Sequence, residues 1–321
     1  MWSVLVTIFP YAIIYTIPIL AAALGGVYSE HSGVVNLGLE GLMCVGFFAS
    51  AIVIKYTAPY FYSHYPEGSF MFSTFPIIVG IVVAIIAGGL FSLLHAFASI
   101  NLKADQIISG TAINMLATAL TVYFSRTFTG SGNIRIIQGI IPKNVPFLSK
   151  IPIIGPLLFT KTYWSSWLVL IILGLSWFFL YKTSFGLRLR ACGEHPQAVQ
   201  SAGINVYHMR YFGVVMSGCL SGLGGACILV TYGNEFNGTV SGLGFLALAA
   251  MIFGQWKPLG VLGASFFFGL ATTIANVSQV IPQLESIPLI VLKTFPFVVT
   301  LIALVIFSKK SAAPKCDGVP F

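Results

Sequence analysis

The chain has 321 residues, of which 57% are hydrophobic and only 7% are charged, with 16 Lys and Arg against 8 Asp and Glu for a net charge of +8. This composition excludes a soluble globular domain and indicates an integral membrane protein with room for about eight to ten spans of roughly 20 residues. We interpret the basic excess as membrane topology and lipid headgroup contact, and not as nucleic-acid binding.

Apolar runs predict nine spans in chain order. They lie at about 2–24, 33–54, 76–98, 106–124, 163–181, 211–231, 239–254, 259–280 and 286–307. A signal peptide needs basic residues before its apolar stretch, but the first basic residue of this chain is Lys55. We therefore interpret the first apolar run as a span. The run at 239–254 is short and glycine-rich, which favours a broken or re-entrant segment. The predicted fold is therefore an all-α polytopic membrane protein of about 8–10 transmembrane helices, with a transmembrane domain over 1–308 and a tail over 309–321.

The start of the second span is unusually polar for a membrane helix. Glu40 would sit within an apolar helix, where a carboxylate is costly unless it is paired or faces a cavity. Glycines at positions 33, 38 and 41 allow a broken helix whose freed backbone groups could bind a polar solute. Asn36 and Glu40 are thus candidates for a substrate pathway. Structural hydrogen bonds that lock the helices together are the alternative.

The fourth span opens with a second group of polar side chains. Ser109 and Thr111 can bond to carbonyls of their own helix and are weak candidates. Gln106 and Asn114 have more donors and acceptors than a helix can satisfy, so we add them to the candidate pathway. An amide offers a donor and an acceptor together, which suits many polar solutes without being specific for one of them.

Later in the chain, Gly218 and Gly222 are four residues apart and predict a small face for close helix contact in lipid.

The stretch Thr183–Asn205 is the longest polar, basic interruption of the second half. Pro196 suits the first position of a short helix, and Gly203 suits the left-handed residue that ends one. Small residues on one face of this helix, including Ala198, would let a partner's groove approach closely. A merely solvated loop is the alternative.

This stretch resembles the coupling loop of bacterial ATP-binding-cassette importer permeases. The similar residues are Gly186–Ala191, Gly193–Glu194, Ala198 and Gly203–Asn205. The group concerned serves branched-chain amino acids, ribose and purine nucleosides, and the likeness is closest to the nucleoside permeases. Residues 32–41 and 106–114 resemble the same family, and the likeness covers about 28–307.

The resemblance implies a multi-pass permease subunit of the bacterial cytoplasmic (inner) membrane. Its loop at 182–210 would be cytoplasmic and its short helix would sit in a groove of a separate ATPase. The implied ATPase-coupling residues are Gly186, Arg188, Arg190, Glu194, Ala198 and Gly203. Further implied partners are a related second permease and an external substrate-binding lipoprotein that delivers a small-molecule solute. The basic loop at 125–162 would then be external, where it could steer an acidic docking surface or contact lipid phosphates.

Motifs for chemistry are missing from the sequence. There is no GxxxxGK[ST] loop, so we expect ATP hydrolysis on a partner and not on this chain. No HExxH, GxSxG or Cys/His cluster indicates an enzyme, a metal site or a cofactor. Two other functions stay open: a ribose or branched-chain amino acid permease of the same architecture, and an ion-driven secondary transporter or channel that needs no ATPase.

Overall fold

The computed structural model describes residues 2–137, 139–146, 148–152, 154–277 and 313–321, together with 290–291, 294–295, 298 and 302. Within these residues, seven helical segments are long and apolar enough to cross a membrane. They are Ile8–His31, Leu39–His64, Phe75–Asn101, Gln106–Thr129, Trp164–Lys182, Val206–Gly233 and Pro258–Asn276. Each corresponds to a predicted span, which confirms the all-α polytopic fold. The predicted span at 286–307 lies largely outside the described residues.

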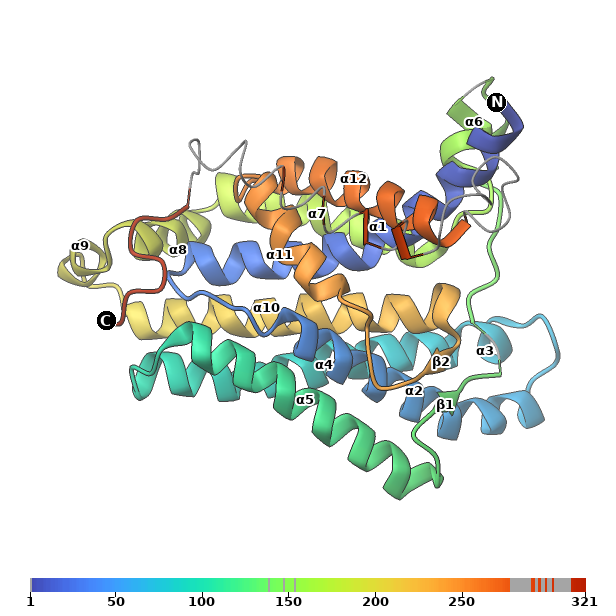
Figure 1. The fold of residues 1–321 in the computed structure, drawn as a ribbon, viewed down its shortest axis with the longest axis horizontal. Coiled ribbons are helices and arrows are strands. Elements are labelled where there is room, and N and C mark those ends of the chain that lie inside the picture. Colours follow the sequence, from blue (N-terminus) through green and yellow to red (C-terminus); the bar gives the residue numbers. More distant parts are fainter. Residues whose placement is uncertain are drawn as a thin grey trace.

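The long helices run side by side along the bundle (Figure 1). They are α1 (Trp2–His31), α2 (Leu39–His64), α4 (Phe75–Ala96), α5 (Gln106–Thr129), α7 (Trp164–Lys182), α10 (Val206–Ile228) and α12 (Pro258–Val277). Two of them continue as π-helical turns, α4 into η1 (Phe97–Asn101) and α10 into η3 (Leu229–Gly233).

Short elements mark the two ends of the bundle. One end carries α8 (Ser184–Glu194), α9 (Pro196–Ser201) and the C-terminus (Figure 1). The other end carries α3 (Phe70–Ser73), η2 (Leu148–Lys150), α6 (Ile154–Leu158) and the strands β1 (Ile134–Arg135) and β2 (Glu235–Phe236). The strands pair antiparallel, with Ile134 opposite Phe236. We refer below to the α9 end and the β1–β2 end.

Close contact between glycines brings the central helices together. A Cβ on Gly218 of α10 would lie 2.4 Å from the carbonyl oxygen of Gly88 on α4, and one on Gly222 would lie 2.3 Å from the carbonyl oxygen of Ala84. Only residues without a side chain allow this approach, and in lipid such packing replaces the hydrophobic effect as the driving force for helix association. The predicted small-residue face is therefore confirmed.

Burial distinguishes central helices from peripheral ones. In the most apolar window of each span, 83% of residues are buried for Val206–Gly233 and 72% for Ile8–His31, but only 22% for Gln106–Thr129. Helices α10 and α1 thus form the centre of the bundle. Helix α5 leaves most of its surface, including Met115 and Ile108, to lipid or to a partner chain.

Two segments of the bundle are discontinuous, as predicted for the second span and for the run at 239–254. After α1 ends at His31, residues 34–36 have no regular structure and α2 begins only at Leu39. After β2, the chain turns back and α11 (Leu243–Phe253) begins near the middle of the bundle (Figure 1). Gly33 and Gly242 have positive φ angles of 88° and 81°, which glycine tolerates without strain.

Candidate functional site

The two discontinuous segments meet at Glu40, on the first turn of α2. Its Oε1 accepts a hydrogen bond from Gly242 N (2.8 Å) and its Oε2 accepts one from Gly244 N (2.7 Å). A Cβ on Gly244 would lie 2.4 Å from the Glu40 Cα, so the two backbones touch. The carboxylate thus caps the start of α11, where free N–H groups and the helix dipole favour a negative charge. This explains how an apolar span accommodates an acid. We call this contact the Glu40 clamp.

Three amide side chains hold the irregular stretch that leads to Glu40. Asn114 donates from Nδ2 to the carbonyl of Leu37 (2.8 Å) and accepts from Gly41 N (2.7 Å). Asn36 donates to Ser217 Oγ (2.9 Å), and its Oδ1 accepts from Gly38 N (3.0 Å). The backbone groups freed by the broken helix are therefore satisfied by side chains, as burial requires.

Gln106 completes this set and leaves one donor over. Its Oε1 accepts from Val35 N (2.7 Å), while its Nε2 is buried and has no hydrogen-bond partner among the described residues. The structure thus brings all four predicted pathway residues together around positions 34–41, and shows each in a structural hydrogen bond.

Sequence reasoning missed a fifth member of this network, His95. Its Nε2 lies 3.0 Å from the carbonyl oxygen of Val35 and its Nδ1 lies 2.9 Å from Ser109 Oγ. The side chain is fully buried. A single histidine in an apolar run carries no signal for a contact 60 residues away, so only the fold could find it.

At the α9 end, the predicted short helix is confirmed. Helix α9 begins at Pro196, and Gly203 follows it with φ of 78°. Ala198 on this helix and Arg188 on α8 are exposed. Both are accessible to a partner.

Other predicted coupling residues attach α8 to the bundle. A Cβ on Gly186 would lie 2.1 Å from the carbonyl oxygen of Phe179, so this glycine packs directly on α7. Arg190 donates from Nε to the carbonyl of Leu180 (3.1 Å), and its guanidinium lies 4.7 Å from the ring centroid of Tyr181. Gly186 and Arg190 are therefore anchors of the loop.

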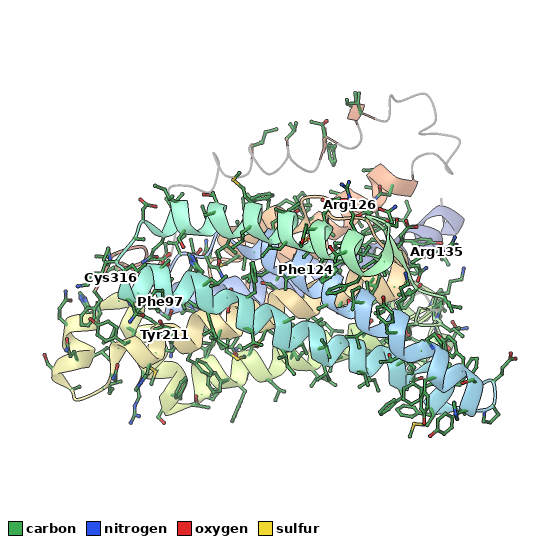
Figure 2. All side chains as sticks on the ribbon, turned by 90° about the horizontal axis from the view of Figure 1, so that it is seen from below. Phe97, Phe124, Arg126, Arg135, Tyr211 and Cys316 are labelled. Carbon is green, nitrogen blue, oxygen red and sulfur yellow. The ribbon has the colours of Figure 1, made fainter. Side chains whose placement is uncertain are left out.

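The described part of the tail, 313–321, folds back onto the same end, and Figure 2 shows Cys316 at the end of the bundle that also carries Phe97 and Tyr211. Cys316 N donates to the carbonyl of Gly193 (2.8 Å), and its Sγ donates to the carbonyl of Glu194 (3.2 Å). The carboxyl group of Asp317 lies near that of Glu30 at the end of α1. Burial raises the pKa of Asp317 to about 7. The tail thus ties the end of α8 to the end of α1.

A cavity of about 620 Å³ opens at the β1–β2 end. Its lining combines residues of α1, α2, α10, η3, α11 and α12 with the segment 234–242 and with Asn133, which precedes β1. They are Tyr15, Phe47, Asn133, Ile228, Tyr232, Gly233, Glu235, Asn237, Thr239, Val240, Ser241, Leu243, Leu246, Thr272, Ala275 and Asn276. None of the four predicted pathway residues lines it, although Ser241 and Leu243 flank Gly242 of the Glu40 clamp. Sequence reasoning missed this cavity because its residues come from so many separate elements.

Long apolar helices around two interrupted segments, with an exposed short helix at one end, are features of a multi-pass membrane transport protein. The chain belongs to the family described as "Branched-chain amino acid transport system / permease component", whose model matches residues 8–305. The family predicted from the sequence is therefore confirmed.

Individual relatives are similar along nearly the whole chain. The nucleoside ABC transporter permease protein NupC of Lactococcus lactis subsp. cremoris is 44% identical over 96% of this chain and 94% of its own. The guanosine ABC transporter permease protein NupQ of Bacillus subtilis is 41% identical over 99% and 97%. A second guanosine permease of Bacillus subtilis, NupP, is 25% identical over 78% of this chain and 69% of its own.

Proposed function

We propose that this chain is the transmembrane permease subunit of an ATP-binding-cassette importer for purine nucleosides in the bacterial cytoplasmic membrane. The observation that carries the proposal is the likeness of 41–44% over nearly the full length to permeases named for nucleosides and guanosine. Ribose and branched-chain amino acids stay as alternative solutes, because permeases for them share the architecture.

The α9 end supplies the surface that a separate ATPase would contact. Ala198 and Arg188 are exposed there, while Gly186 and Arg190 hold the loop against α7. Gly203 ends α9 in a left-handed conformation, and Glu194 lies where the tail docks. Movement of α9 would thus reach α1, α7 and the tail through fixed contacts. This end faces the cytoplasm in the proposed orientation.

Two further partners fit the rest of the surface. Bacillus subtilis has both NupQ and NupP, two relatives of this chain named for guanosine, which supports a pair of different permease chains. The largely exposed α5 offers a face for the second one. Figure 2 shows Arg126 and Arg135 at the β1–β2 end, where a basic surface suits an acidic docking face of an external substrate-binding lipoprotein.

The residues of the broken segments have a defined place in this mechanism. Asn36, Gln106 and Asn114 hold the stretch 34–41, and Glu40 joins it to α11. We assign them to the wall of the solute pathway, whose shape would change when the two segments separate.

Uptake of labelled guanosine in the source cells, with and without this chain, tests the proposed solute. Deletion should abolish uptake that unlabelled adenosine competes for and that ribose, leucine and free bases do not. Unchanged uptake in cells that lack a second nucleoside system would refute the nucleoside assignment, and competition by ribose or leucine would support the alternatives.

A bulky residue on α9 tests the coupling surface. Ala198→Trp should abolish guanosine uptake and solute-stimulated ATP hydrolysis, because a large side chain prevents close approach of a partner groove. Ala198→Ser keeps the side chain small and serves as the matched control. Both variants should reach the membrane in equal amounts, since Ala198 is exposed. Full activity of the Trp variant would exclude this surface as the coupling site.

A further inference from the structure

We propose that the cavity at the β1–β2 end is a recognition site for a purine nucleoside, occupied before the solute passes the Glu40 clamp. The inference rests on the proposed function and adds the residues that would hold the solute. Pockets of roughly 300–1,000 Å³ hold small organic ligands in proteins, and this cavity measures about 620 Å³.

Aromatic rings give the cavity a surface for a flat base. The ring centroids of Tyr15 and Tyr232 lie 4.5 Å apart, and Phe47 also contributes to the wall. Any nucleobase can stack on such rings, because every base has a π-face. The hydroxyl of Tyr232 is buried without a hydrogen-bond partner among the described residues. A small turn of the ring toward the cavity would let a polar group of a solute satisfy it.

Polar groups in the same lining match a nucleoside better than a lipid tail. Three amide side chains and three hydroxyls line the cavity, from Asn133, Asn237, Asn276, Thr239, Ser241 and Thr272. Several of these groups already bond within the chain, such as Asn133 to Glu235 and Thr272 to the carbonyl of Phe268. Ribose hydroxyls and base edges can use the donors and acceptors that remain, whereas an acyl chain can use none of them.

A single carboxylate in the lining indicates which purine compounds fit. Glu235 Oε1 accepts from Asn133 Nδ2 at 2.7 Å, which fixes the side chain and leaves its other oxygen to accept. Guanine presents N–H donors beside each other on its pairing edge, and a carboxylate accepts such donors well. The same negative charge repels a phosphate at close range. The cavity should therefore bind guanosine and reject guanosine monophosphate.

The site is contiguous with the Glu40 clamp. Val240, Ser241 and Leu243 line the cavity, and Gly242 between them donates its N–H to Glu40. A solute on this segment would contact the peptide groups next to the clamp. Occupancy of the cavity and opening of the clamp are therefore adjacent steps along one segment.

Cysteine protection in intact cells tests the site. Thr239 lines the cavity, is exposed and is replaced by a residue of similar size in Thr239→Cys. A membrane-impermeant methanethiosulfonate should label this variant from outside and block guanosine uptake. Excess guanosine should slow the labelling at least several-fold, whereas guanosine monophosphate, ribose and leucine should not. The native chain, which has five cysteines of its own, supplies the background.

Ile137→Cys is a control for protection by a docked binding protein instead of by solute in the cavity. Ile137 is 80% exposed at the same end but does not line the cavity. Equal protection of both variants by guanosine would overturn the inference, because a solute-loaded binding protein would then cover the whole end. Labelling of Thr239→Cys that neither blocks uptake nor responds to guanosine would also overturn it. In both cases the proposed function still stands, because it fails only if guanosine uptake is independent of this chain.

Tyr232→Phe gives a second test that removes only a hydroxyl. Loss of one hydrogen bond to the solute corresponds to about a 3- to 10-fold loss of apparent affinity. We expect a loss of this size in the guanosine concentration that protects Thr239→Cys. Tyr123→Phe, an exposed tyrosine on α5 outside the cavity, should change nothing. Protection that is unaltered by Tyr232→Phe would remove this hydroxyl from the site.

Discussion

Replacing Glu40 by glutamine tests whether the Glu40 clamp holds the two broken segments together. The two carboxylate oxygens accept hydrogen bonds of 2.8 and 2.7 Å from Gly242 and Gly244. Hydrogen bonds to a charged group contribute about 1.5–3 kcal/mol each, and neutral ones about 0.5–1.5 kcal/mol. Glutamine keeps one neutral acceptor and turns its amino group toward the other N–H. Replacing two hydrogen bonds to a charged group by one neutral bond should therefore lower the free energy of unfolding by about 2–5 kcal/mol.

Thermal unfolding of the purified protein in detergent measures this loss. We expect the midpoint of Glu40→Gln to fall by about 4 °C or more, and guanosine uptake in cells to fall with it. Glu67→Gln is the matched control, because Glu67 is exposed and has no charged partner among the described residues. Equal midpoints for the native chain and both variants would show that the clamp does not stabilise the fold.

Two further predictions concern the helix packing and the tail. Gly218→Ala should lower the unfolding midpoint, since the added Cβ would lie 2.4 Å from the Gly88 carbonyl oxygen and overpacking costs about 1–3 kcal/mol. Gly174→Ala is the control, because a Cβ there meets nothing within 4 Å, and it should leave the unfolding midpoint unchanged or raise it. An equal fall of the midpoint for both variants would refute the packing argument. Because docking raises the pKa of Asp317 to about 7, protonation stabilises the docked tail. This stabilisation is complete below about pH 4 and is lost as the pH rises through 7. Hydrogen exchange of residues 313–321 measures this effect, with Asp317→Asn as the reference at each pH. Protection of the native tail should fall toward pH 8 relative to the variant. A ratio of exchange rates between native chain and variant that stays constant with pH would contradict the prediction.

Much of the architecture could be predicted because membrane spans are defined by local composition. Backbone polar groups must be satisfied inside lipid, so an apolar run of about 20 residues folds as a helix whatever lies beside it. The ends of α9 were equally local, because Pro196 and Gly203 restrict their own backbone angles. The small face of Gly218 and Gly222 was visible from spacing alone.

The candidate site was predicted only in part. Glu40 and the three amides stood out because uncompensated polar groups are costly in an apolar span. Their partners could not be read from the same pattern. Glu40 bonds to residues more than 200 positions away, and Gln106 bonds to a backbone group 71 positions away.

By itself, the sequence determined that this is a polytopic helical membrane protein, where the spans of its described residues lie and which polar residues need an explanation. Those properties depend on the hydropathy and backbone preferences of neighbouring residues. Only the tertiary structure decided that Glu40 caps α11, that the tail docks beside Gly193 and that Tyr15, Tyr232 and Glu235 share one cavity. Such contacts depend on how the helices cross and on where the broken segments turn back, and both are set by packing between residues far apart in the chain.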